Sequence, residues 1–156
     1  RGETLVSLDG QDRKLDESML VISDVESAVG LAGIIGGENS RVTENTTSIL
    51  LESANFNAIN NRKTAQSLRI TTEASIRFEK NLRIELPPIA LARATSLIKT
   101  LAGGTVSRGI IDEFPSQNAY KAPQLMFTRT RIEKVLGTKI PMEKVQTVLK
   151  SLAFSS

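Results

Sequence analysis

Three short segments of the chain carry the residues whose types could do chemistry. The first is the glycine-rich stretch 30–40, which reads Gly-Leu-Ala-Gly-Ile-Ile-Gly-Gly-Glu-Asn-Ser. Glycines clustered in this way are typical of tight backbone geometry or of a backbone that a ligand approaches closely. The second is Glu52, which ends the apolar run 49–51, and the third is the hydroxyl-rich run 71–75. Together they could supply backbone N–H donors in a pocket wall, a carboxylate acceptor, and hydroxyls that orient water and a polar substrate.

Each segment also has a plainer explanation in local structure. The glycines fit a strand end packed beneath a helix, and they match neither the dinucleotide spacing Gly-x-Gly-x-x-Gly nor a phosphate-binding loop. Glu52 fits an exposed strand terminus, and the order Thr72, Glu73, Ser75 is common where a helix begins. If Glu52 lies in a pocket, burial would raise its pKa and hydrogen-bond donors would lower it.

Composition narrows the chemistry further. The 156 residues include no cysteine and no histidine, which excludes disulfides, thiolate metal sites and histidine general bases. A hydrolytic reaction would therefore use carboxylates, hydroxyls, backbone groups or the substrate itself, or else a histidine that comes from outside this sequence. The absence of cysteine favours a cytoplasmic location, and no apolar run reaches the roughly 18 residues that a membrane span needs.

Charge is divided unevenly along the chain. Residues 1–60 carry a net charge of −6 (4 basic and 10 acidic residues), whereas residues 61–156 carry +9 (16 basic and 7 acidic). A basic half suggests a polyanionic partner such as a nucleic acid, or a solvated surface balanced by the acidic half. Only six residues are aromatic, so we do not expect a surface that stacks single-stranded bases.

The elements that must position these residues indicate a mixed α+β (α/β) fold, in which a β-sheet packs with helices. A hairpin is expected over residues 3–15, because the Asp9-Gly10 pair is a strong turn signal. Apolar patterns predict the remaining elements. The expected strands are 19–23, 28–35, 48–54, 106–114 and 124–127, and the expected helices are 58–68, 88–102, 129–136 and one after Pro141.

A linker is expected at 115–123, which reads Pro-Ser-Gln-Asn-Ala-Tyr-Lys-Ala-Pro. Beyond it, two helices separated by Gly137 form a small helix–turn–helix-like segment. Its lysines fit a nucleic-acid module, and they also fit a small packing domain with a solvated face: Lys134, Lys139, Lys144 and Lys150. We expect the chain to be an internal piece of a longer protein.

Four motifs, in this order and spacing, resemble the beta subunit of bacterial phenylalanyl-tRNA synthetases. They are the stretch 30–40, Leu-Leu-Glu-Ser-Ala-Asn-Phe at 50–56, Arg-Lys-Thr-Ala at 62–65, and Thr-Glu-Ala-Ser-Ile-Arg-Phe-Glu-Lys at 72–80. The resemblance covers nearly the whole chain. It implies that residues 1–118 are the later part of the central editing domain, and that residues 119–156 begin a following winged-helix-like domain.

The resemblance also implies roles for individual residues. Gly36 matches the pocket glycine, and Glu52 matches the glutamate that helps recognise a tyrosine hydroxyl. Thr72 and Ala74 match the threonine and the small residue that line the pocket; Glu52 and Thr72 are the expected catalytic residues, and no metal site is expected. A synthetic site shaped for phenylalanine cannot strongly reject an added hydroxyl, so a second site that hydrogen-bonds this hydroxyl can select tyrosine for removal.

The implied function is hydrolytic editing of Tyr-tRNA(Phe) within phenylalanine–tRNA ligase, impaired in this piece. The implied partners are tRNA(Phe) and the alpha subunit, with no membrane; ATP and magnesium are implied for the whole enzyme, and no cofactor for this chain. Two other functions stay open, namely a non-catalytic module that binds tRNA or subunits and an unrelated small-ligand protein. The chain departs from the family at residues 68–70 and 81–84, and the family's pocket histidine would precede Arg1.

Overall fold

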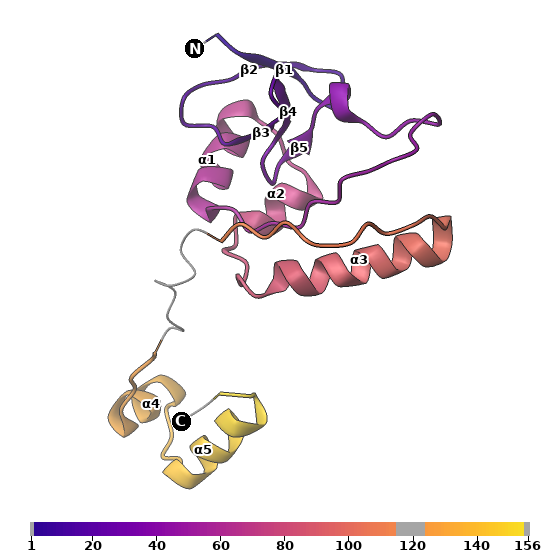
Figure 1. The fold of residues 1–156 in the computed structure, drawn as a ribbon. Coiled ribbons are helices and arrows are strands. Elements are labelled where there is room, and N and C mark those ends of the chain that lie inside the picture. The colour runs from indigo at the N-terminus through magenta and orange to yellow at the C-terminus, as the bar shows by residue number, and fades with distance from the viewer. Residues whose placement is uncertain (1, 115–123, 155–156) are drawn as a thin grey trace. The chain divides into compact units, whose positions relative to one another are not determined.

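The computed structural model describes residues 2–114 and 124–154. The chain divides into two compact units, residues 1–108 and residues 109–156. Strands and helices are both present among the described residues, which confirms the predicted mixed α+β class (Figure 1). No helix in these two described ranges is long and apolar enough to cross a membrane. The predicted linker lies outside the described residues, so the predicted domain boundary at residue 118 stays a prediction.

The N-terminal hairpin forms around the predicted turn at 9–10. Strands β1 (Thr4–Val6) and β2 (Asp12–Lys14) pair antiparallel. Gly10 adopts a φ of +76°, a conformation that glycine reaches without a steric penalty, and its N–H donates to the Ser7 carbonyl at 2.8 Å. The predicted hairpin is therefore confirmed.

The Arg13 side chain ties this hairpin to a distant part of the chain. Its guanidinium donates to Ser7 Oγ at 3.2 Å, to Asp9 Oδ2 at 2.6 Å and to the Leu68 carbonyl at 3.3 Å. Ser7 is fully buried, and its hydroxyl, which donates to Asp9 at 2.5 Å, is the main reason why the pKa of Asp9 lies below its ordinary value. The Arg13 guanidinium thus joins the hairpin to the residues around position 68.

A second sheet carries the glycine-rich stretch. It consists of β3 (Val21–Ser23), β4 (Ala28–Leu31) and β5 (Ile35–Gly36), which pair antiparallel in that order. An isolated antiparallel bridge between Ser7 and Gly37 connects this sheet with the hairpin. The two small sheets therefore meet at the end of β5.

Two predicted strands differ in extent from those in the structure. The predicted strand 28–35 divides into β4 and β5, because the chain turns at Gly33, whose φ is +66°. The predicted strand 19–23 forms only in its last three residues. A continuous apolar run with glycines inside it did not reveal the turn, since glycine is compatible with both conformations.

No strand forms over residues 48–54, so that prediction is wrong. The apolar side chains of this run are not buried against a sheet, and Leu50 is 92% exposed. A polar contact holds the segment instead: Ser53 Oγ donates to the Pro87 carbonyl at 2.8 Å.

Three helices follow in the first unit. Helix α1 (Ala58–Leu68) has the predicted bounds, α2 (Glu73–Phe78) is a short helix, and α3 (Leu86–Ala102) begins two residues before its predicted start. The side chain of Asn57 caps α1 by accepting two backbone N–H bonds, and α1 ends where Arg69 adopts a φ of +53°. The second sheet thus carries Gly36, and the capped start of α2 carries Thr72 and Ala74.

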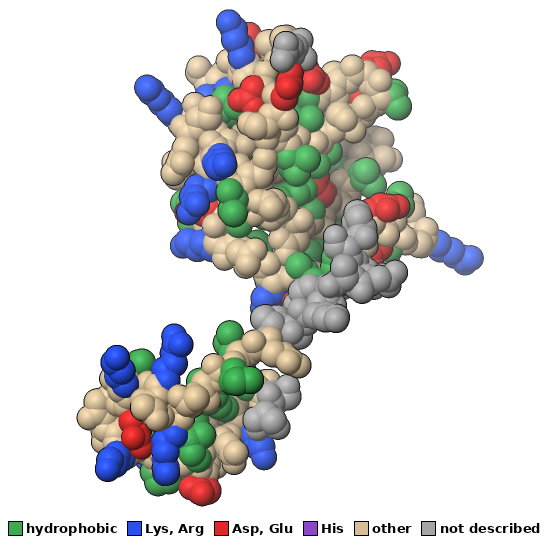
Figure 2. All heavy atoms as spheres, turned by 90° about the vertical axis from the view of Figure 1, so that its left-hand side faces the viewer, with side chains coloured by type: hydrophobic (Ala, Val, Ile, Leu, Met, Phe, Trp, Pro, Cys, Tyr) green, Lys and Arg blue, Asp and Glu red, His purple; other side chains and the backbone are tan. Residues whose placement is uncertain are grey.

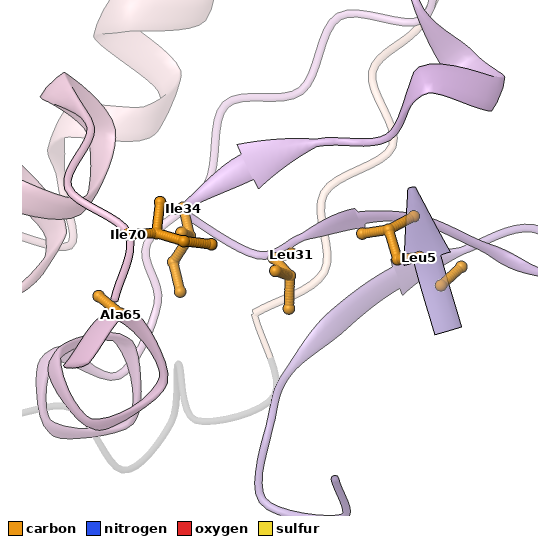
Figure 3. Packing of buried hydrophobic residues seen from close by; sticks show 6 residues of the cluster. Leu5, Leu31, Ile34, Ala65 and Ile70 are labelled. Atoms are coloured by element: carbon orange, nitrogen blue, oxygen red, sulfur yellow. The ribbon is translucent and has the colours of Figure 1, made fainter. Parts of the chain in front are cut away.

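The apolar core extends from α1 across the second sheet to β1 of the hairpin, as Figure 3 shows. Ile34, from the turn between β4 and β5, points toward Ile70, just beyond α1 (Figure 3). Burial of this isoleucine fixes the turn against the helices. The buried apolar residues of the cluster are Leu5, Ala28, Leu31, Ile34, Ala65 and Ile70.

Helix α3 and the segment after it contribute nothing to this core. No α3 side chain is buried. The predicted strand 106–114 is wrong, because this described segment has no regular structure and its apolar side chains are exposed: Ile110 is 77% and Ile111 86% exposed. A strand needs a partner for its backbone groups, and the pattern of side chains alone did not supply one.

The second unit contains the predicted helix–Gly–helix segment. Helices α4 (Arg129–Leu136) and α5 (Met142–Ser151) are confirmed. The Thr128 side chain caps α4, and Gly137 ends it with a φ of +69°. The predicted strand 124–127 is wrong, since these described residues form no regular element.

Candidate functional site

The turn between β4 and β5 is packed so closely that only glycine fits at its centre. A Cβ on Gly33 would lie 2.7 Å from the Asn61 side-chain amide, 2.9 Å from the Phe56 ring and 3.0 Å from the Phe78 ring. These two rings contact each other in a tilted arrangement, with centroids 5.2 Å apart. The glycine therefore has the structural role considered above, that of a strand end packed beneath helices.

Gly36 lies three residues further, at the end of β5. The Gly37 N–H donates to the Val29 carbonyl at 2.8 Å, so the adjacent pair Gly30–Gly36 exchanges no hydrogen bonds and the polar groups of Gly36 turn away from β4. The Gly36 carbonyl accepts the Leu8 N–H at 3.0 Å. Its N–H faces the same edge of the strand, where Leu8 of the hairpin lies.

Thr72 links α2 to the glycine-rich turn. Its Oγ1 donates to the Ile34 carbonyl at 2.7 Å and accepts the Ser75 N–H at 3.0 Å. Ser75 Oγ in turn accepts the Thr72 N–H at 2.9 Å, which completes a capping box at the start of α2. The capping turn considered for residues 71–75 is therefore confirmed. The hydroxyl proton of Thr72 is committed, and one lone pair is left for a water molecule.

Ala74 follows two residues later, in the first turn of α2, where it is half-buried. The structure thus brings Thr72 and Ala74 to the same helix start, and the Thr72 hydroxyl reaches a carbonyl two residues before Gly36. Three of the four predicted site residues consequently belong to two chain segments that are in direct contact.

Glu52 belongs to a third segment. The residue as a whole is exposed, but nearby protein atoms partly bury its carboxyl group. This partial burial raises the pKa of the carboxyl group above its ordinary value of 4.5. The segment is held by Ser53 and by Asn55, whose Nδ2 donates to the Leu82 carbonyl at 2.9 Å. Among the described residues, no hydrogen bond or ion pair reaches the Glu52 carboxylate.

The four predicted site residues are therefore not all joined by contacts. Within the described ranges, no hydrogen bond connects Glu52 with Gly36, Thr72 or Ala74. The prediction that all four line one cavity stays a prediction, and so do their catalytic and binding roles.

The sequence analysis missed Asn61, which is only 1% exposed. A signal for it was present: in helix α1, positions 61, 64, 65 and 68 share one face, and Thr64 and Ala65 on that face are buried. An asparagine on a buried helix face must find hydrogen-bond partners, because an unsatisfied buried amide is unfavourable.

The second unit holds a groove between α4 and α5 of about 310 Å³. Figure 2 shows hydrophobic side chains and many Lys and Arg side chains on the visible face of this unit. The choice between a nucleic-acid module and a packing domain stays open. Apolar side chains line the groove, among them Phe127, Ile132, Leu136, Val145, Val148 and Leu149.

Metal ligands are not gathered in the part of the chain that the structure describes. In residues 2–114 and 124–154, no group of three or more carboxylates lies close enough together to hold a metal ion. The expectations of no metal site and no cofactor in this chain stay predictions.

Comparison with known proteins gives the family. The family model for the B3/4 domain matches residues 1–103. The chain is 43% identical over 153 residues to the phenylalanine–tRNA ligase beta subunit of Dehalococcoides mccartyi (strain CBDB1), which covers 98% of this chain and 19% of that protein.

Other relatives bear the same name. The beta subunit from Syntrophotalea carbinolica is 44% identical over 150 residues (96% of this chain, 18% of that protein), and that from Geobacter sulfurreducens is 41% identical over 155 residues (99% and 19%). The chain spans about a fifth of the length of these relatives. With its B3/4 match and its close similarity to ligase subunits along nearly all of its length, the chain belongs to the B3/4 domain family as it occurs in phenylalanine–tRNA ligase beta subunits.

Proposed function

We propose that this chain forms part of an editing site that hydrolyses tyrosine wrongly attached to tRNA(Phe). In this proposal it acts within a phenylalanine–tRNA ligase beta subunit, in the cytoplasm, with an alpha subunit and tRNA(Phe) as partners. ATP and magnesium would serve aminoacylation elsewhere in that enzyme. The family match and the names of the relatives support the setting.

The observation that carries the proposal is the contact between α2 and the glycine-rich turn. The Thr72 Oγ1 bond to the Ile34 carbonyl, 2.7 Å long, joins the segment with Thr72 and Ala74 to the strand with Gly36. Two of the segments that the family resemblance assigns to the pocket are thereby neighbours, although 36 positions separate Gly36 from Thr72 in the sequence. The Thr72 hydroxyl and the small Ala74 side chain lie at this contact.

Selection of tyrosine over phenylalanine follows from the polar groups. In the proposal, a Glu52 carboxylate oxygen accepts the tyrosine hydroxyl, the Gly36 N–H donates to that hydroxyl oxygen, and Ala74 leaves room for the ring. Phenylalanine would leave the same polar groups desolvated and unmatched, which is unfavourable. Because the Glu52 carboxylate has no partner among the described residues, it is available to bind the substrate.

The hydrolysis itself replaces one bond by another. A water oxygen forms a bond with the ester carbonyl carbon, the bond from that carbon to the ribose oxygen breaks, and a proton moves from the water to the ribose oxygen. Thr72 cannot supply this proton without releasing the Ile34 carbonyl, but its free lone pair can accept a hydrogen bond from the water. The chain itself has no histidine, so its own residues can pass the proton only through a carboxylate, a hydroxyl or bound water.

Deacylation of Tyr-tRNA(Phe) by the intact beta subunit, assembled with its alpha subunit, tests the proposal. Glu52→Ala should lower kcat/KM for this reaction by roughly 5- to 150-fold, because loss of one buried hydrogen-bond partner costs about 1–3 kcal/mol. The matched control is Glu44→Ala, which removes an exposed glutamate from the same irregular segment. If the two variants deacylate Tyr-tRNA(Phe) at equal rates, Glu52 is not part of the editing site.

Ala74→Trp tests shape separately from polarity. A tryptophan at this half-buried position should block entry of the tyrosyl group, whereas charging with phenylalanine should persist. Deacylation and charging are measured on the same preparation. Editing that survives the substitution, or a parallel fall of both activities, would contradict the role of Ala74.

A non-catalytic RNA-binding role is favoured by one observation, the charge of the second unit. Residues 124–154 contain six basic and two acidic residues. Binding of tRNA(Phe) measured across a series of salt concentrations should show a steep salt dependence if these cations contact phosphates. Binding without any deacylation would favour this second function over editing.

A further inference from the structure

Three consecutive backbone carbonyls of the glycine-rich turn are held by side chains of two helices. With its NH₂ group facing the turn, the Asn61 amide of α1 donates to the Ala32 carbonyl at 3.2 Å and to the Gly33 carbonyl at 3.0 Å. The Thr72 hydroxyl at the start of α2 donates to the next carbonyl, that of Ile34, at 2.7 Å. We call this arrangement, formed by Asn61 and Thr72 on carbonyls 32–34, the carbonyl clamp.

Burial makes Asn61 the stronger half of the clamp. The residue is 1% exposed, so its amide protons have almost no access to water, and the two carbonyls satisfy them. The close approach depends on Gly33, because a Cβ there would lie 2.7 Å from the Asn61 side chain. Without the Asn61 amide, two carbonyls in a packed region would lose their donors, and the turn would lose its fixed orientation.

The orientation of the turn determines where Gly36 lies. Only Ile35 separates the clamped carbonyls from Gly36, and the strand is held on its other side by the Leu8 N–H, which donates to the Gly36 carbonyl at 3.0 Å. Gly36 is thus located by one bond from the hairpin and by the clamp from the helices. A binding wall must be held within about 0.5 Å of its productive position for selectivity.

We infer that Asn61 is a positioning residue of the proposed editing site: through the carbonyl clamp it sets the position of the Gly36 backbone against which the tyrosyl group is selected. The inference rests on the proposed function. Asn61 acts through the turn and is not expected to touch the substrate. Its loss should therefore reduce the preference of the site for tyrosine, in addition to any effect on stability.

The test compares Asn61→Leu with Asn60→Leu in the intact ligase. Leucine has a similar size but cannot donate hydrogen bonds. Asn60 is a matched control, because its Nδ2 also donates to a distant carbonyl, that of Ser18, at 2.6 Å, far along the chain from the turn. One readout is hydrogen exchange of the Ile34 and Gly37 amides, which bond to the Leu31 and Val29 carbonyls.

The second readout is the ratio of deacylation rates for Tyr-tRNA(Phe) and Phe-tRNA(Phe). A smaller fraction of folded enzyme lowers both rates equally, so the ratio reports positioning and not stability. We expect Asn61→Leu to speed exchange at Ile34 and Gly37 and to lower the ratio by roughly 10-fold or more, as small misplacements of binding groups do. Asn60→Leu should change neither.

Exchange at Ile34 and Gly37 that matches the Asn60→Leu control, or an unchanged ratio despite slower deacylation, would overturn the inference. If Asn61→Leu does not fold, Asn61→Ala is used, because a water molecule can enter the smaller site and partner the carbonyls without fixing them; the same two readouts decide. A wild-type ligase that deacylates neither ester would overturn the proposed editing function, and exchange would still show whether Asn61 holds the turn.

Discussion

The glycine-rich turn and helix α3 lie in the same unit of the chain, yet they are stabilised in different ways. At the turn, three carbonyls receive side-chain donors, and Ile34 is buried in the core. Helix α3 is nearly three times as long as α2, but none of its side chains is buried, and Leu101 is 81% exposed. The apolar pattern was sufficient to predict α3, whereas the contacts that fix the turn are polar and come from distant positions.

A regular sequence pattern and a well-fixed position in the fold are separate properties of a segment. A helix such as α3 follows from its periodicity, two prolines in its first turn and a terminal Gly103. The turn follows from specific contacts, each of which a single substitution can remove. Substitutions at the turn should therefore be costly, and those at highly exposed apolar positions of α3, such as Leu101, should not.

The largest effect is expected for Gly33→Ala. The new Cβ would contact the Asn61, Phe56 and Phe78 side chains within 3.0 Å, in a backbone conformation that alanine adopts poorly, so the free energy of unfolding should fall by about 2–4 kcal/mol. Urea unfolding measures this. Gly36→Ala is the control: its Cβ would meet only the flexible Leu8 side chain, and the loss should stay below about 1 kcal/mol. If the free energy of unfolding falls by similar amounts in both variants, the close packing around Gly33 does not account for the stability of the turn.

A smaller effect is expected for Thr72→Val. Valine keeps the shape but removes both the bond to the Ile34 carbonyl and the cap of α2, which should lower the free energy of unfolding by about 1–3 kcal/mol. Thr72→Ser retains the hydroxyl and should recover most of this loss. If the serine variant is as unstable as the valine variant, the methyl group and not the hydroxyl holds the turn.

A pH-dependent effect is expected for Glu52→Gln, in the segment attached to the start of α3. Burial raises the folded-state pKa of Glu52 above 4.5, so the folded state binds its proton more tightly than the unfolded state. The contribution of this group to stability is therefore present below pH 4.5 and lost as the pH rises through the folded-state value. Relative to wild type, the glutamine variant should gain stability between pH 4 and pH 7. Unfolding curves that stay parallel across this range would contradict the burial of the carboxyl group.

The smallest effect is expected for Leu101→Gln on α3. Because this side chain is 81% exposed, the free energy of unfolding should change by no more than about 0.5 kcal/mol. Thermal unfolding of the chain measures it. A loss above 1 kcal/mol would show that another surface covers the apolar face of α3 in solution, and would remove the contrast with the turn.

Sequence reasoning was most successful where local signals are strong. The Asp9-Gly10 turn, both bounds of α1 and α4, and the cap at Thr72 follow from turn residues, periodicity and capping preferences. It failed at residues 48–54 and 106–114, because an apolar run does not say whether a neighbouring strand exists to accept its backbone bonds. At the candidate site, the family motif supplied Gly36, Glu52, Thr72 and Ala74 as predictions. Asn61 was missed, because its partners lie about 28 residues earlier in the chain.

The bond from Arg13 to the Leu68 carbonyl has a consequence for the order of folding. The β1–β2 pairing within the hairpin is local, and contacts of this kind form within microseconds. Its attachment to α1 spans 55 positions and must wait until Leu68 has left the ribosome. During synthesis, the local pairing of the hairpin can therefore form early, and its docking through Arg13 is a late step that depends on a complete α1.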